Sequence, residues 1–297
     1  YEKEKVFLDS IQVKYDELGA TTDETKRLAI QGEINRLSIK AGEFAIPNEF
    51  DRLVEGMGGA WINAFTSDDV ICYLNKFPGN QIEKWLEVYS HRFVNPVFRL
   101  FQSELETVYE EKNRAMDNMF RQLFTTYLKN FFKEHPYGQQ TVLGSVDHLK
   151  NPSLSKMREY YDTYYVANNM ALVLTGDIYP EDIKPLIEEK FGTWKSGELP
   201  GPIDITESSF NGREKIRKRM TPIKIGIMGF RTVPAGHEDE VAINLCNQLL
   251  INESKTGLID QLEVEGKILG AGAFNMDYAD LGANNFFFVP KLFFQSL

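Results

Sequence analysis

The sequence predicts an α+β protein, in which a mixed β-sheet flanked by helices is followed by the start of a second, similar unit. Three observations indicate this class. Helical apolar periodicity alternates along the chain with short apolar runs that are typical of strands. The 297 residues exceed what one ordinary core usually fills and fall short of three domains. A strand and a helix also recur in the same order in the last third of the chain.

Residues 1–44 are expected to form a helical hairpin. Apolar residues recur at helical spacing in both arms, around a polar break at 19–22. Thr22 or Asp23 is expected to cap the second arm.

Residues 45–200 are assigned to a first α+β domain. The runs AWINAFTS and VICYLNKF, separated by a turn-like Ser-Asp-Asp, predict an antiparallel strand pair. An amphipathic helix follows over 81–93, and a long helical pattern covers about 102–133. MALVLTGDI, residues 170–178, is nearly continuous in apolar residues and predicts a strand covered by helices.

A segment poor in apolar residues and rich in Gly, Pro and Ser predicts an interdomain linker, placed at 201–214. Residues 215–297 are assigned to a partial second α+β domain. Its expected elements are a strand IKIGIMGFRT, a helix DEVAINLCNQLLI, a helix at about 256–265 and a strand NNFFFVPKLF.

Composition narrows the functional classes. Apolar residues make up 42% and aromatic residues 12%, so the chain can bury substantial cores. A formal net charge of -10 argues against nucleic-acid binding, which needs clustered Lys and Arg. No run approaches the roughly 18 apolar residues of a membrane span. The compartment stays open, because a periplasmic or other extracytoplasmic location would require a signal peptide removed from upstream of Tyr1.

Several common catalytic motifs are absent from the sequence. It contains no GxSxG, no GxxxxGK and no GxGxxG, so serine-hydrolase, P-loop and dinucleotide-binding functions lack support. The four histidines show neither HxxxH nor HxxEH spacing. The two cysteines, Cys72 and Cys246, form no CxxC, and Cys72 is expected to be a buried, inert thiol.

The stretch ELETVYEEKNRAMDN, residues 104–118, is the main candidate for chemistry. Glu104 and Glu111 are seven residues apart and therefore lie only about 20° from each other around a helix. Because apolar residues are interleaved with the glutamates, at least one carboxylate is expected to approach the core. Such a carboxylate needs a cation, a donor or a metal. The competing interpretation is an exposed acidic face.

Asn63, in WINAFT, is a second candidate, because Asn is depleted in strand interiors. Its amide would either stabilise a bend or bulge, or present donors to a ligand or peptide beside the strand. The residues alone do not choose between these roles.

The order of these motifs resembles the first half of the pitrilysin and insulin-degrading-enzyme family of zinc metallopeptidases, the inverzincins. The resemblance covers about residues 48–297. It rests on Asn63-Ala64-Phe65-Thr66-Ser67, on the spacing of Glu104 and Glu111, and on the run from Tyr164 to Asp177.

The resemblance implies a zinc endopeptidase that cleaves peptides or unfolded polypeptides by metal-activated water. Glu111 matches the family's glutamate zinc ligand, and Glu104 matches a companion that supports the site from outside the ligand shell. The strand with Asn63, Ala64, Phe65 and Thr66 matches the family's edge strand, along which a peptide substrate adds by backbone hydrogen bonds.

The family's HxxEH motif, which holds the other two ligands and the general base, is missing from residues 1–297. No catalytic residue is therefore assigned here, and the fragment itself is expected to be inactive and to lack zinc. The favoured explanation places HxxEH upstream of Tyr1, with 1–44 inserted after it. The alternative is a non-catalytic partner or binding subunit. In either case the resemblance implies a homologous subunit or a second half of the same chain as partner.

Overall fold

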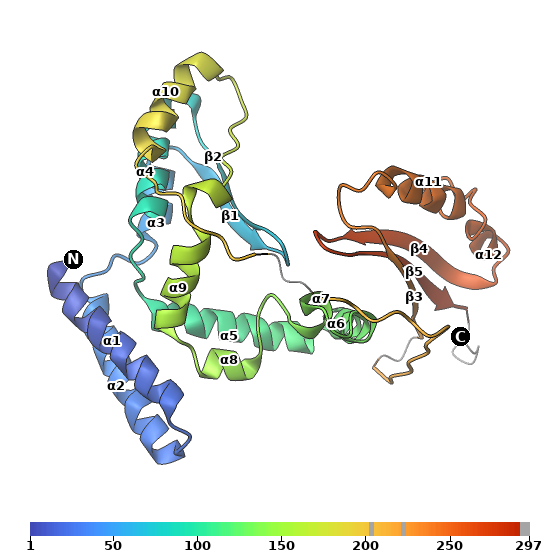
Figure 1. The fold of residues 1–297 in the computed structure, drawn as a ribbon, viewed down its shortest axis with the longest axis horizontal. Coiled ribbons are helices and arrows are strands. Elements are labelled where there is room, and N and C mark those ends of the chain that lie inside the picture. Colours follow the sequence, from blue (N-terminus) through green and yellow to red (C-terminus); the bar gives the residue numbers. More distant parts are fainter. Residues whose placement is uncertain (202–204, 221–223, 292–297) are drawn as a thin grey trace. The chain divides into compact units, whose positions relative to one another are not determined.

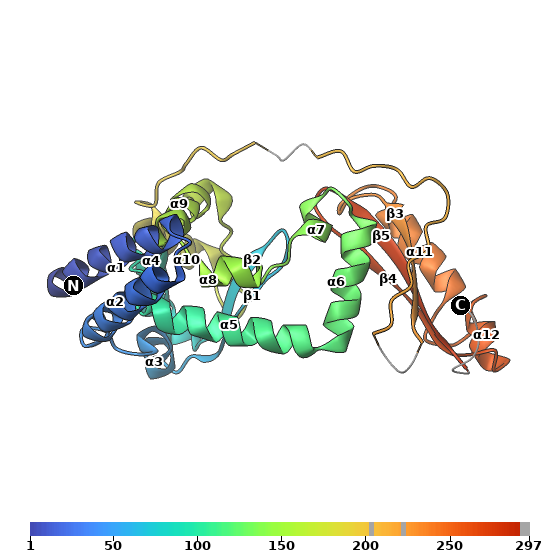
Figure 2. The same cartoon turned by 90° about the horizontal axis from the view of Figure 1, so that it is seen from below.

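The computed structural model describes residues 1–201, 205–220 and 224–291. The chain divides into two compact units, the first comprising 1–65, 71–113 and 143–204, and the second 66–70, 114–142 and 205–297. Each is a mixture of helices and a small sheet, as predicted for an α+β protein (Figures 1 and 2). Parts of three predictions lie outside the described residues, namely 202–204 of the linker, Ile223 of the strand IKIGIMGFRT, and Leu292 and Phe293 of the strand NNFFFVPKLF.

The elements of the first unit lie before the linker. They are α1 Glu2–Ala20, α2 Glu24–Gly42, α3 Glu49–Gly56, β1 Ala60–Thr66, β2 Ile71–Lys76, η1 Gly79–Gln81, α4 Ile82–Val94, α5 Phe101–Asp117, α8 Val146–Lys150, α9 Leu154–Tyr164, η2 Ala167–Asn169 and α10 Pro180–Phe191. The ends of β1 and α5 are grouped with the second unit.

The helices α1 and α2 lie side by side as a hairpin (Figure 1). Their facing sides bury Ile11, Tyr15 and Leu18 from α1 and Ile34 from α2. Asp23 caps α2, because its carboxylate accepts hydrogen bonds from the backbone N–H groups of the first turn. That the hairpin is an insertion stays a prediction.

The core of the first unit is a stack of aromatic rings along α4. Trp85 stacks on Tyr89 with ring centroids 4.2 Å apart and on Phe77 at 4.7 Å. Phe93, two turns after Trp85, stacks on Trp194 at 5.8 Å. The helical spacing of these rings places them on one buried face, so α4 joins the hairpin β1–β2 to α10.

Two predictions in the first unit are wrong. Residues 170–178 form no strand, because none of the described strands pairs with them and a strand exists only within a ladder. The long helix predicted over about 102–133 is broken at Asn118, whose backbone is extended (ψ 110°). The Asn118 side chain accepts a hydrogen bond from the Arg121 N–H at 3.0 Å and so starts a new helix.

The elements of the second unit follow that break and the linker. They are α6 Met119–Phe131, α7 Pro136–Gln139, β3 Gly226–Thr232, α11 Glu240–Leu250, α12 Asp260–Val264, β4 Ile268–Asp277 and β5 Gly282–Pro290. The strands form an antiparallel sheet in the order β3-β5-β4. Asn285 of the central strand β5 lies opposite Gly229 of β3 and opposite Phe274 of β4. The predicted helix at 256–265 is shorter than expected.

The sheet of the second unit has a helix on each face, α6 on one and α11 on the other (Figure 2). Neighbouring residues of β4 show this alternation, since the Phe274 ring packs against Phe124 of α6 while Asn275 bonds to Asn244 of α11. On the α6 face a Cβ at position 229 would come within 1.8 Å of the Tyr127 hydroxyl, so glycine permits the close approach of α6.

Residues 114–142 belong to the second unit by their contacts, whereas they were predicted to lie in the first domain. Glu207 accounts for part of this grouping. Its carboxylate, 2% exposed, accepts the backbone N–H groups of residues 133–135 and pairs with Arg231 at 2.8 Å. The predicted domain limits themselves stay predictions.

Burial by itself would raise the pKa of Glu207, but the three backbone N–H donors and Arg231 outweigh it and hold that pKa below its usual value. The ionised Glu207 carboxylate therefore stabilises the folded state. This contribution is fully present above the unfolded-state pKa of about 4.3 and is lost as pH falls through the lower, folded-state pKa.

We predict that the free energy of unfolding falls more steeply between pH 5 and pH 3 in the wild type than in Glu207→Gln. The measurement is urea denaturation followed by circular dichroism at each pH. Glu253→Gln, at an exposed glutamate, is the control and should follow the wild type. If the free energy of unfolding had the same pH dependence in the wild type and in Glu207→Gln, the ionised Glu207 carboxylate would not be the stabilising group.

Candidate functional site

The N-terminal end of α5 is fixed by α1. The Phe101 ring meets the edge of the Tyr15 ring at a centroid distance of 5.2 Å. The Tyr15 hydroxyl donates to Gln102 Oε1, and Gln102 Nε2 donates to Glu106 Oε1 at 2.9 Å. Burial, together with the Glu106 charge, raises the pKa of Tyr15 to about 12, so this tyrosine remains a neutral donor at physiological pH.

All four glutamates between 104 and 111 are exposed to solvent. The expectation that at least one carboxylate approaches the core is therefore wrong. The physical reason is that α5 lies at the surface of its unit and has no buried residue, so its apolar Leu105, Val108 and Tyr109 are only half-buried. The competing interpretation, an exposed acidic face, describes α5 in this structure.

The described residues do not form a complete metal site. No three of their His, Cys, Asp or Glu side chains come together in a way that could hold a metal ion. Structural and catalytic zinc usually takes at least three protein ligands. Glu111, exposed and seven residues from Glu104, could supply one carboxylate ligand, and the remaining ligands would have to come from elsewhere.

The histidines do not converge on α5. His135 is buried and caps α7, where its Nδ1 accepts from the Tyr137 N–H at 3.3 Å. The other three, His91, His148 and His237, are exposed at separate places in the chain.

Asn63 lies in β1, next to an unusual backbone conformation. Trp61 has φ of 59°, in the left-handed region that non-glycine residues rarely adopt. The Asn63 side-chain oxygen accepts a hydrogen bond from the Ala64 N–H at 2.9 Å. This local bond agrees with the bend interpretation of Asn63.

The strand β1 is exposed along most of its length. Only Ile62 is half-buried, whereas Asn63, Ala64, Phe65 and Thr66 are exposed. As far as the structure describes the chain, β1 pairs with β2 alone, so its other edge is not part of a ladder. Such an edge can accept an extended peptide as an additional strand.

The turn between β1 and β2 contains a residue whose role the sequence analysis missed. The Asp69 carboxylate accepts from the Tyr137 hydroxyl at 2.8 Å and from the Ala279 N–H at 3.1 Å. The Tyr137 hydroxyl in turn accepts from the Asp280 N–H at 3.2 Å, and its ring stacks on Tyr278 at 4.2 Å. Tyr137 lies in the segment HPYG, residues 135–138, which marks the end of a helix in the sequence. Its partner Asp69 is distant in sequence, so no local pattern connects the two residues.

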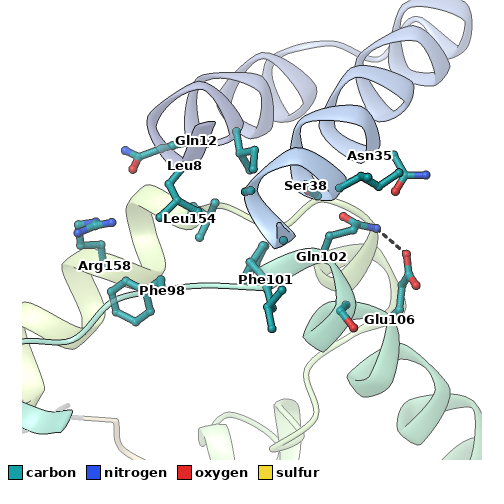
Figure 3. A pocket seen from close by; sticks show the side chains of 16 residues that line it. Leu8, Gln12, Asn35, Ser38, Phe98, Phe101, Gln102, Glu106, Leu154 and Arg158 are labelled. Carbon is teal, nitrogen blue, oxygen red and sulfur yellow. Dashed lines mark hydrogen bonds between the residues drawn. The ribbon is translucent and has the colours of Figure 1, made fainter. Parts of the chain in front are cut away.

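A hollow of about 210 Å³ lies between the helical hairpin and the start of α5 (Figure 3). Its walls are mostly apolar, with Leu8, Phe101 and Leu154 facing it, and the polar pair Gln102 and Glu106 lies at one side. None of the sequence-predicted site residues lines this hollow.

Two models of one protein family match most of this chain. Residues 34–143 match the family model described as insulinase, peptidase family M16, and residues 153–291 match the M16 inactive domain. The chain belongs to the M16 family of metallopeptidases. The resemblance to pitrilysin and insulin-degrading enzyme is confirmed.

Relatives and solved structures agree with this membership. The zinc protease PqqE of Helicobacter pylori is 24% identical over 273 residues, which is 89% of this chain and 61% of the relative. The uncharacterized zinc protease YmxG of Bacillus subtilis is 25% identical, with 80% of this chain and 56% of the relative covered. A protease structure from H. pylori gives a TM-score of 0.73 at 23% identity, covering 83% of this chain and 61% of that one. Pitrilysin gives a TM-score of 0.64 at 16% identity, covering 80% and 27%.

The chain thus spans about three fifths of the length of these zinc protease relatives. The structural likeness supports the M16 fold for both units. Within the described residues, no helix has the length and apolar character to cross a membrane.

We predict that Tyr137→Phe lowers the free energy of unfolding by about 1–3 kcal/mol, because Asp69 loses a donor in a partly buried place. Urea denaturation followed by circular dichroism measures the change. Tyr179→Phe, at a tyrosine that is 62% exposed, should change it by less than about 0.5 kcal/mol. Equal stability of the Tyr137→Phe protein and the wild type would show that the hydroxyl does not anchor the turn.

Proposed function

We propose that the polypeptide to which these residues belong is a zinc-dependent endopeptidase that cleaves peptides or unfolded polypeptides. The observation that carries the proposal is the acidic helix α5, kept in a chain of the M16 family with its glutamates open to solvent. Relatives that match most of this chain are named zinc proteases, which supports a peptidase.

In this proposal Glu111 is one zinc ligand and Glu104 supports it from the same face of α5. The other ligands and the general base would come from an HxxEH segment outside residues 1–297. Zinc, when bound, would activate a water molecule for peptide hydrolysis. An exposed carboxylate suits Glu111 for this role, because it forms no ion pair with the residues that the structure describes, and binding the ion would not first require breaking one.

The substrate is proposed to lie along β1. An extended peptide would bond to the free edge of the strand, beside Asn63, Ala64, Phe65 and Thr66. Main-chain hydrogen bonds do not depend on side-chain identity, so this mode favours substrates that are unfolded or extended over those of one defined sequence.

Residues 1–297 alone are proposed to be inactive, because they supply one candidate ligand and no general base. The proposed partner is therefore a second half of the same chain or a homologous subunit. The first half of the periplasmic protease PqqL from Escherichia coli matches 82% of this chain over 55% of its own length, which supports a two-half arrangement.

A second candidate function is a non-catalytic peptidase-like partner or binding subunit. The incomplete metal site of the described residues favours it. Absence of HxxEH from the complete reading frame, and copurification with an active homologue, would distinguish it from the enzyme.

We predict that Glu111→Gln in the complete polypeptide abolishes both zinc retention and cleavage of a fluorogenic peptide. Glu104→Gln should weaken zinc affinity about 10–100-fold, as expected of a residue that orients a ligand. Zinc content is measured by mass spectrometry after dialysis, and activity by fluorescence.

Glu110→Gln is the matched control, since this exposed glutamate neighbours Glu111 on a different side of the helix. It should keep zinc and activity. With zinc removed by a chelator, all three variants should unfold within about 0.5 kcal/mol of the wild type, because the side chains are exposed. Full activity of the Glu111→Gln protein would refute the ligand assignment.

A further inference from the structure

The outer face of α11 is apolar and exposed. Val241, Leu245 and Leu249 follow each other at intervals of four residues, and their exposed fractions are 76%, 62% and 64%. Leu258, 67% exposed, lies next to Leu249 because its N–H donates to the Leu249 carbonyl at 3.2 Å. These four residues are called the α11 stripe. No charged residue occurs from Val241 to Leu250.

The inner face of α11 carries amides instead. Asn247, 8% exposed, donates to Asn275 on β4 at 2.9 Å and to Asn284 on β5 at 3.1 Å, and it accepts from Asn284 at 2.8 Å. Asn275 donates to Asn244 of the same helix at 2.6 Å. The side of the helix that carries Asn247 therefore faces the sheet.

An ordinary surface helix buries its apolar side and leaves its polar side in water. In α11 the more buried residues are Asn247, Ile243 and Leu250, whereas the apolar stripe is exposed. The amide network fixes the orientation of α11, because rotating the helix to bury the stripe would leave the amides of both strands without partners. The stripe is thus held away from the sheet by hydrogen bonds on the opposite face. A contiguous apolar surface of this kind is typical of a contact with another element.

We propose that the α11 stripe is the seat of an amphipathic helix of the same polypeptide, contributed by sequence outside residues 1–297. An uncharged row at four-residue spacing fits the apolar ridge of a second helix. About two fifths of the length of the H. pylori relative and of the H. pylori structure lies outside the matched part, which leaves sequence for such a helix.

The α11 stripe is too small to bind a separate protein chain stably. A stable interface between two proteins takes about 20–30 residues on each side. The stripe offers four residues on one short helix and the turn after it. A helix of the same polypeptide needs less contact, because it loses no translational freedom when it packs.

The test uses thiol labelling in the complete polypeptide, in a background with Cys72→Ser and Cys246→Ser. One variant carries Leu245→Cys, at the centre of the stripe, and the matched control carries Leu28→Cys, at a leucine that is 70% exposed. In the native state the cysteine at 245 should react with a maleimide about a hundredfold more slowly than the one at 28, since it reacts only when the covering helix opens. In about 6 M urea, which unfolds the protein and exposes both cysteines, the two labelling rates should converge.

Labelling rates within threefold of each other in the native state would overturn the proposal. So would protection that appears only as protein concentration rises, because that result indicates a second copy. A complete reading frame that adds no amphipathic helix would overturn it as well. If a cysteine variant does not fold, protection of the native Cys246, exposed beside the stripe, is measured in Cys72→Ser. These readouts depend on neither zinc nor peptidase activity, so their failure is separate from failure of the proposed function.

Discussion

The candidate site depends on the aromatic stack along α4. Two strands alone are marginally stable in water, so β1 and β2 need a layer that buries one of their faces. Trp85 provides part of it, because its ring lies in the stack while its Nε1 donates to Asn75 of β2 at 3.0 Å. The Arg92 guanidinium extends the layer, 4.1 Å from the centre of the Phe50 ring and 4.7 Å from that of Tyr73. With one face of the hairpin held in this way, β1 can keep its side chains and its free edge in solvent.

The two units stabilise their sheets by different means. The first relies on apolar and aromatic contacts, whereas the second buries asparagines on both faces of β5, with Asn284 bonded to α11 and Asn285 to Tyr127 of α6. Amides buried in this way cost free energy unless all their hydrogen bonds are made. They therefore fix helix orientation more strictly than apolar packing does, and this strictness keeps the α11 stripe turned away from the sheet.

The sequence predicted much of the local structure. Helical periodicity located α1, α2, α4 and α11, and Asp23, one of the two predicted caps, is the observed one because capping depends on neighbouring residues only. β4 was missed, because its Gly270, Ala271 and Gly272 have low strand propensity and their conformation is set by pairing with β5. The strand expected at 170–178 failed for the opposite reason, since its apolar run had no described partner. Tertiary pairing decides both cases.

For the candidate site, spacing alone identified Glu104 and Glu111 as sharing a helix face, and family resemblance assigned their roles. Their exposure could not be predicted, because it depends on how far α5 lies from the core of its unit. The anchoring of Asp69 by Tyr137 joins residues 68 positions apart, which no local pattern reveals.

The central claim is that Glu111 is one ligand of a zinc site completed by residues outside 1–297. Anomalous X-ray diffraction from crystals of the complete polypeptide, at the zinc absorption edge, tests it most directly. The account predicts a single strong peak about 2.0–2.2 Å from a Glu111 carboxylate oxygen. A peak bound by other residues with Glu111 free in solvent, or no peak in zinc-equilibrated crystals, would contradict it.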